Sequence, residues 1–392
     1  MIKIKPKKLS GSVTAVSSKS YAHRLIIAAM LSEDKTEIEI NGISDDIKRT
    51  LECVRSLGGA YFTNGNLICI YPIERGRRAE VFCGESGTTA RIMLPVCAAV
   101  CSSAVISGSG RLPERPFGEI VNSLRRGGVI VDGEKLPIKV CGGMKSGIYE
   151  IEGDVSSQYI TGLMYALGAV GGGEIVLTTP LKSASYVDLT VNVLNQFGVK
   201  AEKTDSGFKI SGSFKTPGKC VCEGDWSNAA FWFGANALGS NISVKGLNIN
   251  SRQGDRKITE LLGRDKIDID SVPDLFPILA ACATGKCGET LLYNAARLRL
   301  KESDRIDAAS ALIKALGGEC EAGADYLKII GHGSLSGGTV DSFGDHRIVM
   351  AAAAASVICE NDVIINGEEA VNKSYPDFFR DFRSLGGEAD VI

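Results

Sequence analysis

One short pattern, an amphipathic stretch that ends in glycine, recurs along the chain and limits the folds that it can adopt. Five copies end at Gly58, Gly127, Gly198, Gly317 and Gly386, and a weaker sixth copy ends at Gly263. A glycine just past a helix can take the left-handed conformation that closes the helix. Strand-like residues follow each copy. We therefore predict six surface helices, each closed by its glycine and each leading into a strand.

A second series of six segments alternates with the first. Each segment begins with a Ser, Asp or Gly, which favour helix starts, and then stays apolar on almost every side. A helix that is apolar all round is typical of a protein interior. The six predicted buried helices lie within residues 17–31, 84–100, 156–170, 224–238, 270–284 and 344–358.

The two series together define six units of about 65 residues, each with a buried helix, a surface helix and several short strands. Alternating apolar segments such as those at 67–73 and 148–153 are typical of strands, so the fold class is mixed α/β. Six units exceed what one hydrophobic core holds. We therefore expect two domains of three units each.

Two spans without a regular pattern suggest where the domains meet, near Ser12–Ser18 and near Cys220–Gly224. Breaks at both spans would make one domain discontinuous, formed by residues 1–16 plus 224–392, while residues 17–222 form the other. The alternation of Ile2 and Ile4 predicts a first strand that joins the C-terminal half. We expect the two spans to act as a hinge between an open and a closed state.

Composition excludes several classes of protein. The 392 residues are 44% hydrophobic and 23% charged, with a formal net charge of -2, so we expect neither nucleic acid nor a membrane as a partner. The longest apolar run, Ile348–Ile358, is too short to span a bilayer and predicts a buried helix. The basic N-terminus lacks the apolar core of a signal peptide. We expect a cytoplasmic monomer that acts on small molecules.

The cysteines give no sign of a metal site. Twelve are scattered along the chain without a CxxC pair, and the only histidines are His23, His332 and His346. Reduced thiols within the core are the favoured interpretation, although the sequence leaves disulfides open. We expect neither a metal nor an organic cofactor.

The stretch Arg297–Ile306 has charges of both signs at six of its ten positions and precedes an apolar-periodic run typical of a helix. A helix start exposes unpaired N–H groups and positive potential, which suit anions. We interpret these charges as a wall of an anion-binding active site rather than as a solvated helix face.

Distinctive polar residues also stand at or near the starts of the predicted buried helices. If those helices point at one cleft, a substrate with several phosphate or carboxylate groups would fit there. Taken singly, such Ser and Asp residues are ordinary caps, such cations are ordinary paired side chains, and His346 is a cap or hydrogen-bond partner rather than a base. The candidates are Lys19, Ser20, Arg24, Gly87, Thr88, Arg91, Arg115, Ser156, Ser157, Gln158, Asp274, Lys301, Arg305, His346, Arg347 and Lys373.

Motifs in this order and spacing resemble the enolpyruvyl transferase family over the whole chain, and most closely its EPSP synthase branch. They are "SKSYAHR" (18–24), "GESGTTAR" (84–91), "RLPERP" (111–116), "SSQ" (156–158), "SASYVDLT" (183–190), "VPD" (272–274), "RLKESDR" (299–305), "GDHR" (344–347) and "NKSYPD" (372–377). The resemblance implies two domains, each of three βαβαββ-like units with parallel helices buried inside, an inside-out α/β barrel.

The resemblance also implies an activity and site residues. The reaction transfers the enolpyruvyl group of phosphoenolpyruvate to the 5-hydroxyl of shikimate 3-phosphate and releases phosphate after a tetrahedral intermediate, in aromatic amino acid biosynthesis. The implied catalytic residues are Asp274 as base, Glu302 for the methylene proton, and Lys19. Implied shikimate 3-phosphate ligands are Lys19, Ser20, Arg24, Ser156, Ser157, Gln158, Ser183, Asp274 and Lys301. Implied phosphoenolpyruvate ligands, for which the inhibitor glyphosate would compete, are Lys19, Gly87, Arg115, Gln158, Arg305, Arg347 and Lys373.

Some positions depart from the family pattern, and two other classes stay open. "AVSSKS" replaces the usual "PGSKS", Glu85 stands where Asn is common, and Arg297-Leu298 replaces Asn-Trp, so Arg297 receives no role. The related UDP-N-acetylglucosamine branch usually has a reactive Cys on a loop of the first domain, but the matching loop here, "GSGRLPERPFG", has none. A non-catalytic repeat scaffold would not need Asp274 and Glu302 beside so many cations.

Overall fold

A computed structural model describes all 392 residues. The backbone divides into two compact units, a terminal unit of Met1–Ser18 with Glu223–Ile392 and a central unit of Lys19–Cys222. Each unit has a hydrophobic core of its own. None of the helices combines the length and the hydropathy that crossing a bilayer requires. The division expected from the sequence, 1–16 plus 224–392 and 17–222, stays our proposal for the parts that move separately.

Helices that are buried almost all round form the centre of each unit, as predicted. In α5, every residue from Tyr159 to Leu167 is buried, and the polyalanine stretch of α11 is buried in full. The longest apolar run thus forms a buried helix continued by a short 3-10 turn. The buried helices are α1 Lys19–Leu31, α3 Gly87–Val100 and α5 Ser157–Ala169 in the central unit, and α7 Trp226–Ala237, α9 Phe276–Thr284 and α11 His346–Ala355 in the terminal unit.

A second set of helices has one buried face each. In α2, Ile47, Leu51 and Val54 are buried while acidic and basic residues fill the other face, which is the spacing of an amphipathic helix. This set comprises α2 Asp45–Ser56, α4 Gly118–Arg126 and α6 Ala184–Gln196, and α8 Ile258–Leu261, α10 Arg305–Ala315 and α12 Phe378–Ser384.

Short strands complete the units. The central unit contains β3 Thr36–Glu39, β4 Ala60–Asn64, β5 Leu67–Tyr71, β6 Arg78–Phe82, β7 Ser103–Ser107, β8 Val131–Asp132, β9 Ile138–Cys141, β10 Ile148–Ile151, β11 Gly172–Leu177, β12 Val199–Lys203, β13 Gly207–Gly212 and β14 Lys219–Val221. The terminal unit contains β1 Ile2–Lys5, β2 Ser10–Thr14, β15 Asn241–Lys245, β16 Lys266–Asp268, β17 Gly288–Tyr293, β18 Glu319–Ala322, β19 Leu327–Gly331, β20 Gly338–Asp341, β21 Val363–Asn366 and β22 Glu388–Val391.

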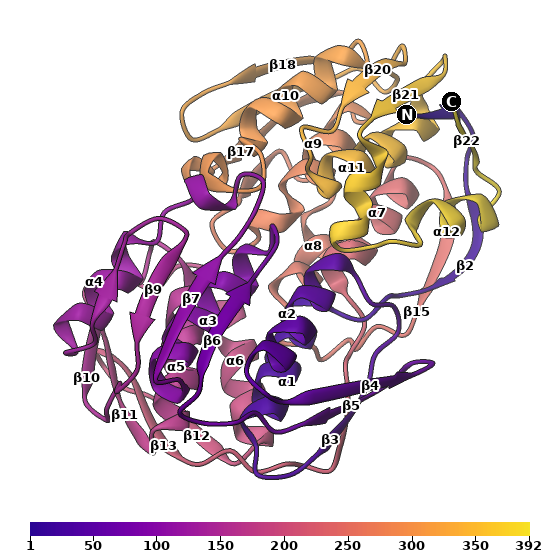
Figure 1. Ribbon diagram of the computed structural model, residues 1–392. Helices are drawn as coiled ribbons and strands as arrows, with labels where there is room; N and C mark the ends of the chain where they lie inside the picture. The colour runs from indigo at the N-terminus through magenta and orange to yellow at the C-terminus, as the bar shows by residue number, and fades with distance from the viewer. The chain divides into compact units, whose positions relative to one another are not determined.

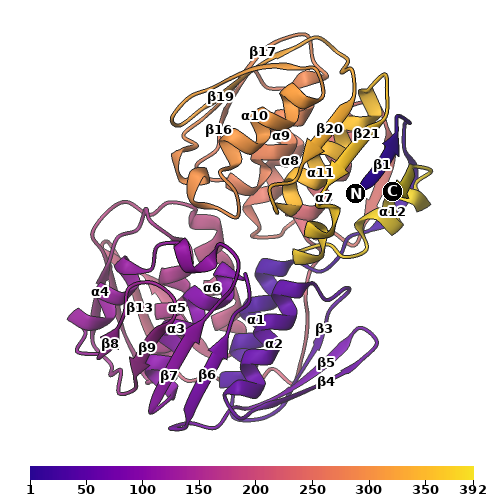
Figure 2. The same cartoon turned by 45° about the horizontal axis from the view of Figure 1, so that its top comes forward.

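Five four-stranded sheets repeat one topology, of which β6-β7-β9-β8 is an example. In this example β6 and β7 are parallel and are joined through the buried helix α3, and β8 and β9 add in antiparallel order after the surface helix α4. This arrangement is a βαβαββ unit, so the predicted fold class of repeated α/β units around buried helices is confirmed. Figures 1 and 2 show the sheets as the outer layer of each unit, with the buried helices behind them.

The sixth repeat is reduced. Its sheet has only the parallel pair β2 and β15, and its surface helix is the four-residue α8 after the 3-10 turn Gly254–Lys257. This is the repeat whose glycine, Gly263, gave the weakest pattern in the sequence.

Strands from distant parts of the sequence complete two of the four-stranded sheets. Strand β1 lies between β21 and β22, antiparallel to both, and Figure 1 shows the indigo N-terminal strand beside the yellow C-terminal ones. Strand β14, which follows the third repeat of the central unit, pairs in parallel with β3 of the first. Each unit is thereby closed by a strand from a distant part of the sequence.

Two predictions about local structure were wrong. In the second repeat the left-handed residue is Gly128, with φ of 83°, whereas Gly127 has φ of -74°. The helix therefore closes one residue later than predicted, because consecutive glycines leave the closing position open to either. The spans near Ser12–Ser18 and Cys220–Gly224 are also not irregular throughout, since Ser12 lies in β2 and Cys220 lies in β14.

Candidate active site

The helix starts of the central unit hold one group of candidates, which we call the first array: Lys19, Ser20, Arg24, Gly87, Arg91, Arg115, Ser156, Ser157, Gln158 and Ser183. Ser86 caps α3, with its hydroxyl accepting from Thr89 N, and Ser156 caps α5, accepting from Gln158 N. Ser183 precedes α6 in the left-handed region, with φ of 53°, and does not cap it. Strained backbone of this kind recurs at functional positions.

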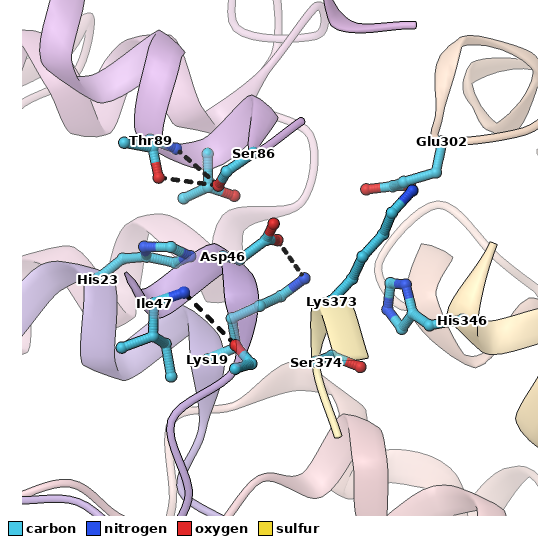
Figure 3. Close-up of polar contacts among 12 residues, drawn as sticks. Lys19, His23, Asp46, Ile47, Ser86, Thr89, Glu302, His346, Lys373 and Ser374 are labelled. Atoms are coloured by element: carbon cyan, nitrogen blue, oxygen red, sulfur yellow. Dashed lines mark hydrogen bonds and ion pairs between the residues drawn. The ribbon is translucent and has the colours of Figure 1, made fainter. Parts of the chain in front are cut away.

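Lys19 opens α1 and is held by an acidic residue of the neighbouring helix. Its Nζ lies 2.9 Å from Asp46 Oδ2, a pair drawn in Figure 3. Both side chains are largely buried, at 13% and 14% exposed. Sequence motifs did not single out Asp46, although acidic residues in the first turn of a helix are common and stabilising.

Arg24 lies one turn further along α1 and is 1% exposed. It donates to Thr190 Oγ1, to Thr161 Oγ1, and to the carbonyls of Ser20 and Tyr186. Burial lowers the pKa of Arg24 to about 10. Of these four hydrogen bonds, one lies within α1 and three fix α1 against α5 and α6.

Arg91 and Gln158 link α3 to α5. Arg91 Nη1 donates to Gln158 Oε1 at 2.9 Å, and Gln158 Nε2 donates to Thr88 Oγ1 at 2.7 Å. The two helices approach closely because α5 has Gly162 at the contact, where a Cβ atom would lie 2.9 Å from the Arg91 carbonyl oxygen. Gln158 is thus fixed at the start of its helix.

Gly87 and Arg115 are in close contact. A Cβ atom at Gly87 would lie 2.5 Å from Arg115 Nη1 and 3.0 Å from its Cζ. Arg115 follows the 3-10 turn Leu112–Glu114 and is 8% exposed. The structure therefore brings a buried guanidinium against the N-terminus of α3, where unpaired N–H groups also favour an anion.

The terminal unit holds the second array: Asp274, Lys301, Glu302, Arg305, Arg347 and Lys373. Arg305, at 1% exposed, contacts three carboxylates. Its Nη1 lies 2.7 Å from Asp274 Oδ1, its Nη2 lies 2.9 Å from Glu302 Oε2, and its Nε lies 2.9 Å from Asp345 Oδ2. Burial alone would lower the pKa of Arg305, but these carboxylates hold it well above its usual range.

Asp274 is the second centre of this array. It also pairs with Arg347 Nη2 at 2.9 Å and lies 3.8 Å from Lys301 Nζ. Burial alone would raise the pKa of Asp274, but Arg347, Lys301 and Arg305 outweigh it and hold the pKa well below its ordinary value. Asp274 is thus an anion on which three cations converge.

Asp345 supports the second array from its buried side. Its side chain is 0% exposed, caps α11 by accepting from Arg347 N, and accepts from Ser303 Oγ as well as from Arg305. The helix cap is therefore Asp345 rather than His346. Lys373 reaches the Gly344 carbonyl oxygen at 2.9 Å, and Figure 3 shows Lys373 and Glu302 pointing toward one another.

The interpretation of all charges at 297–306 as an active-site wall was wrong in part. Arg299 pairs with Asp304 and Asp307 and donates to the carbonyls of Gly323 and Ala324, and Arg297 pairs with Asp270. These contacts stabilise local structure around the start of α10. Only Lys301, Glu302 and Arg305 join the second array.

Asp255 is a buried carboxyl group that the sequence motifs did not indicate. It is 2% exposed, accepts a hydrogen bond from Ser227 Oγ, and has no partner for Oδ1. Burial and the nearby charge of Asp274 raise the pKa of Asp255 to about 7, against the opposing effect of Arg347. The only signal in the sequence was its place after Gly254 at a helix start.

Comparison with known proteins shows the family. The model of the family described as EPSP synthase (3-phosphoshikimate 1-carboxyvinyltransferase) matches residues 3–265 and 260–382. The 3-phosphoshikimate 1-carboxyvinyltransferase of Clostridium kluyveri is 39% identical, over 99% of this chain and 98% of its own length. That of Clostridioides difficile is 34% identical, over 99% and 98%.

This chain belongs to the EPSP synthase family. Its fold is that of EPSP synthase from Acinetobacter baumannii, with a TM-score of 0.81, 24% identity, and coverage of 100% of this chain and 99% of that one. The enolpyruvyl transferase NikO from Streptomyces tendae has the same fold, with a TM-score of 0.81, 16% identity and coverage of 99% and 98%. The resemblance to EPSP synthases inferred from the motifs is thereby confirmed.

Within this EPSP synthase family member, the predicted site residues fall into the two arrays described above, one in each unit. The thiols of all twelve cysteines are free, and seven of them are buried. The prediction that they all lie within the core was wrong for Cys287, which is exposed. No group of three or more His, Cys, Asp or Glu side chains is placed to hold a metal ion.

Proposed function

We propose that this chain catalyses the reaction for which its family is named, with the residues of the two arrays as its binding and catalytic groups. The oxygen of the shikimate 3-phosphate 5-hydroxyl adds to C2 of phosphoenolpyruvate while the methylene carbon takes a proton. Phosphate then leaves, the methyl group loses a proton, and the enolpyruvyl ether remains. The observation that carries this proposal is the cluster in which the guanidinium group of Arg305 contacts the carboxylates of Asp274 and Glu302.

Fixed cations are what two polyanionic substrates require. Arg305 and Arg347 present planar guanidinium groups, which suit carboxylate and phosphate oxygens. Asp345 holds Arg305 from the buried side, so this cation does not have to reorganise when charge develops during the reaction. With Lys373 and, from the first array, Lys19, Gly87, Arg115 and Gln158, these residues are the proposed phosphoenolpyruvate ligands.

Asp274 is the proposed base for the 5-hydroxyl proton. Its depressed pKa makes it a poor base while Arg347, Lys301 and Arg305 surround it. Anionic substrate that binds the same cations would offset their charge at Asp274, and the pKa of Asp274 would then rise toward the ordinary value. The base would thus become active only when phosphoenolpyruvate is bound.

Glu302 is the proposed group for the proton at the methylene carbon. General acid catalysis at carbon needs a carboxyl group separate from the base at oxygen, and Glu302 and Asp274 contact different nitrogens of Arg305. Lys19, held by Asp46, is proposed to stabilise the charge that develops on the reacting groups.

The remaining residues of the first array are the proposed ligands of shikimate 3-phosphate. Hydroxyl and amide groups at the starts of α5 and α6 suit its phosphate, together with the backbone N–H groups there. This set comprises Lys19, Ser20, Arg24, Ser156, Ser157, Gln158 and Ser183, with Asp274 and Lys301 from the second array. We propose that the protein works as a cytoplasmic monomer and needs no cofactor.

The proposal is tested with the purified chain, shikimate 3-phosphate and phosphoenolpyruvate. Inorganic phosphate release and the new enolpyruvyl product are measured together, and omission of either substrate is the control. Equal amounts of phosphate and product support the proposal. Phosphate release only when UDP-N-acetylglucosamine replaces shikimate 3-phosphate would instead place the chain in the other branch of the enolpyruvyl transferases.

A further inference from the structure

A series of buried hydrogen bonds, which we call the relay, crosses three helices of the central unit and ends at the start of α3. His23 Nδ1 of α1 lies 2.7 Å from Thr50 Oγ1 of α2, which lies 2.8 Å from Thr89 Oγ1 of α3. Thr89 Oγ1 in turn lies 2.8 Å from Ser86 Oγ. All four side chains are at most 1% exposed. Figure 3 shows the bonds between Thr89 and Ser86, with His23 on the neighbouring helix.

The order of the protons along this relay follows from counting donors. The Thr89 hydroxyl donates to Ser86 Oγ, and a hydroxyl has one proton. Thr89 must therefore accept from Thr50, which uses the only proton of Thr50. The contact between Thr50 and His23 then requires that the ring Nδ1 carries the proton and donates it.

The second ring nitrogen of His23, Nε2, carries no proton, because the ring is neutral. Burial and the charges of Lys19 and Arg24 lower the pKa of His23 well below its usual value, so the ring holds one proton only. Nε2 is buried and has no hydrogen-bond partner. An unpaired buried acceptor destabilises the folded state. In this relay the unpaired acceptor lies at the end that is remote from α3.

The other end of the relay is the hydroxyl proton of Ser86. Ser86 Oγ accepts from Thr89 N at 3.3 Å and from the Thr89 hydroxyl, so both of its lone pairs are used. Its own proton finds no acceptor in the protein. Ser86 directly precedes Gly87, whose backbone packs against the Arg115 guanidinium.

We propose that Ser86 is an additional substrate-binding residue, whose hydroxyl donates to an anionic oxygen of phosphoenolpyruvate bound at the start of α3. His23, Thr50 and Thr89 are positioning residues that keep the Ser86 proton directed at the ligand. The inference rests on the proposed function, because it takes phosphoenolpyruvate as the anion. If each hydrogen bond of the relay ran in the opposite direction, Ser86 would donate to Thr89 and the ligand would lack this donor.

The tautomer of His23 tests the direction of the relay without any assay of activity. A long-range 1H–15N spectrum of the labelled protein reports which ring nitrogen is protonated, and His23→Gln identifies the signal among the three histidines. We expect a neutral ring with the proton on Nδ1 across pH 6 to 8. A proton on Nε2, or on both nitrogens, would overturn the proposal.

Kinetics of Ser86 variants test the contact with the ligand. Ser86→Ala should raise KM for phosphoenolpyruvate about tenfold, because a hydrogen bond to a charged group is lost, and should leave KM for shikimate 3-phosphate within about twofold. Ser86→Thr, which keeps the hydroxyl, should stay close to the natural protein. Ser44→Ala removes a cap of the same kind from α2 and gives the loss of thermal stability that a missing cap alone produces.

Thr50→Val tests the relay even if Ser86→Ala fails to fold. We expect about a threefold rise in KM for phosphoenolpyruvate, which Thr50→Ser restores. Thr36→Val is the matched control, since Thr36 is also buried and bonded to a second threonine hydroxyl but lies in β3. An unchanged KM for phosphoenolpyruvate in both Ser86→Ala and Thr50→Val would contradict the inference. Failure of the natural protein to form product would instead contradict the proposed function and leave the tautomer result standing.

Discussion

Arg305 and Asp274 form an ion pair in which Nη1 and Oδ1 are 2.7 Å apart and the arginine side chain is 1% exposed. The same carboxylate pairs with Arg347, so both of its oxygens are engaged by guanidinium groups. Anionic substrate would compete for these groups. The pair therefore links two proposed roles, because the cations that bind phosphoenolpyruvate also control the basicity of Asp274.

Asp274→Asn should lower kcat by about a hundredfold or more, since the amide cannot accept the hydroxyl proton. Substrate binding should weaken little. Steady-state kinetics and direct binding of shikimate 3-phosphate measure the two effects. Asp270→Asn is the control, because Asp270 pairs with Arg297 outside the array, and it should keep nearly full turnover. Near-normal kcat in Asp274→Asn would remove Asp274 from the catalytic role.

Glu302→Gln should also lower kcat by about a hundredfold or more, through loss of the proton at the methylene carbon. The exchange of solvent deuterium into the methylene group of phosphoenolpyruvate is the specific readout. We expect this exchange to be lost together with turnover. If exchange continued at the normal rate while turnover fell, another group would have to supply the proton.

Gly87→Ala should raise KM for phosphoenolpyruvate and weaken competition by glyphosate. The added methyl group would lie 2.5 Å from Arg115 Nη1, so the guanidinium has to move away from the start of α3. Backbone strain is not involved, because Gly87 lies within a regular helix. Gly118→Ala, where a Cβ meets open space, is the matched control. Unchanged inhibition in Gly87→Ala would argue against an anion at this position.

Asp255→Asn should stabilise the protein at pH 8 but hardly at pH 4. The folded-state pKa is about 7 against an ordinary value of 3.8, so the folded state holds a proton that the unfolded state releases between these values. Stability from this group therefore falls as pH rises from about 4 to 7, and the full penalty is present above 7. Thermal unfolding should show a gain of roughly 1–4 kcal/mol at pH 8.

Asp205→Asn serves as the control for this comparison, because Asp205 is exposed. An equal effect of Asp255→Asn at both pH values would show that folding does not raise the pKa of Asp255. A loss of stability at pH 8 would show that its charge is compensated by Arg347 more strongly than the burial and the unpaired Oδ1 suggest.

The repeated fold was open to prediction because its signal is local and occurs six times. Apolar residues all round α5 require a buried helix, and a glycine past α2 or α10 closes each of them in the left-handed conformation. The misplaced closure at Gly127 had a local cause, since Gly128 follows it. By contrast, the completion of two sheets by β1 and β14 depends on pairing between distant segments.

The sequence predicted site residues only where they stand in a recognisable motif. Arg305 and Asp274 stand in motifs, but the pairing of Arg299 with Asp304 and of Arg305 with Asp345 depends on rotamers and on packing across helices. A sequence of six charges does not show which of them face inward. The relay through Thr50 has no sequence signature either, because a single buried threonine looks like any other core residue.

The measurement that tests the account most directly is a coupled determination of phosphate and product from shikimate 3-phosphate and phosphoenolpyruvate, in a buffer that contains a metal chelator. The account predicts one phosphate released for each enolpyruvyl ether formed, with Asp274→Asn reducing both equally. Phosphate release without the ether, or activity that returns only when a divalent metal is added, would contradict it.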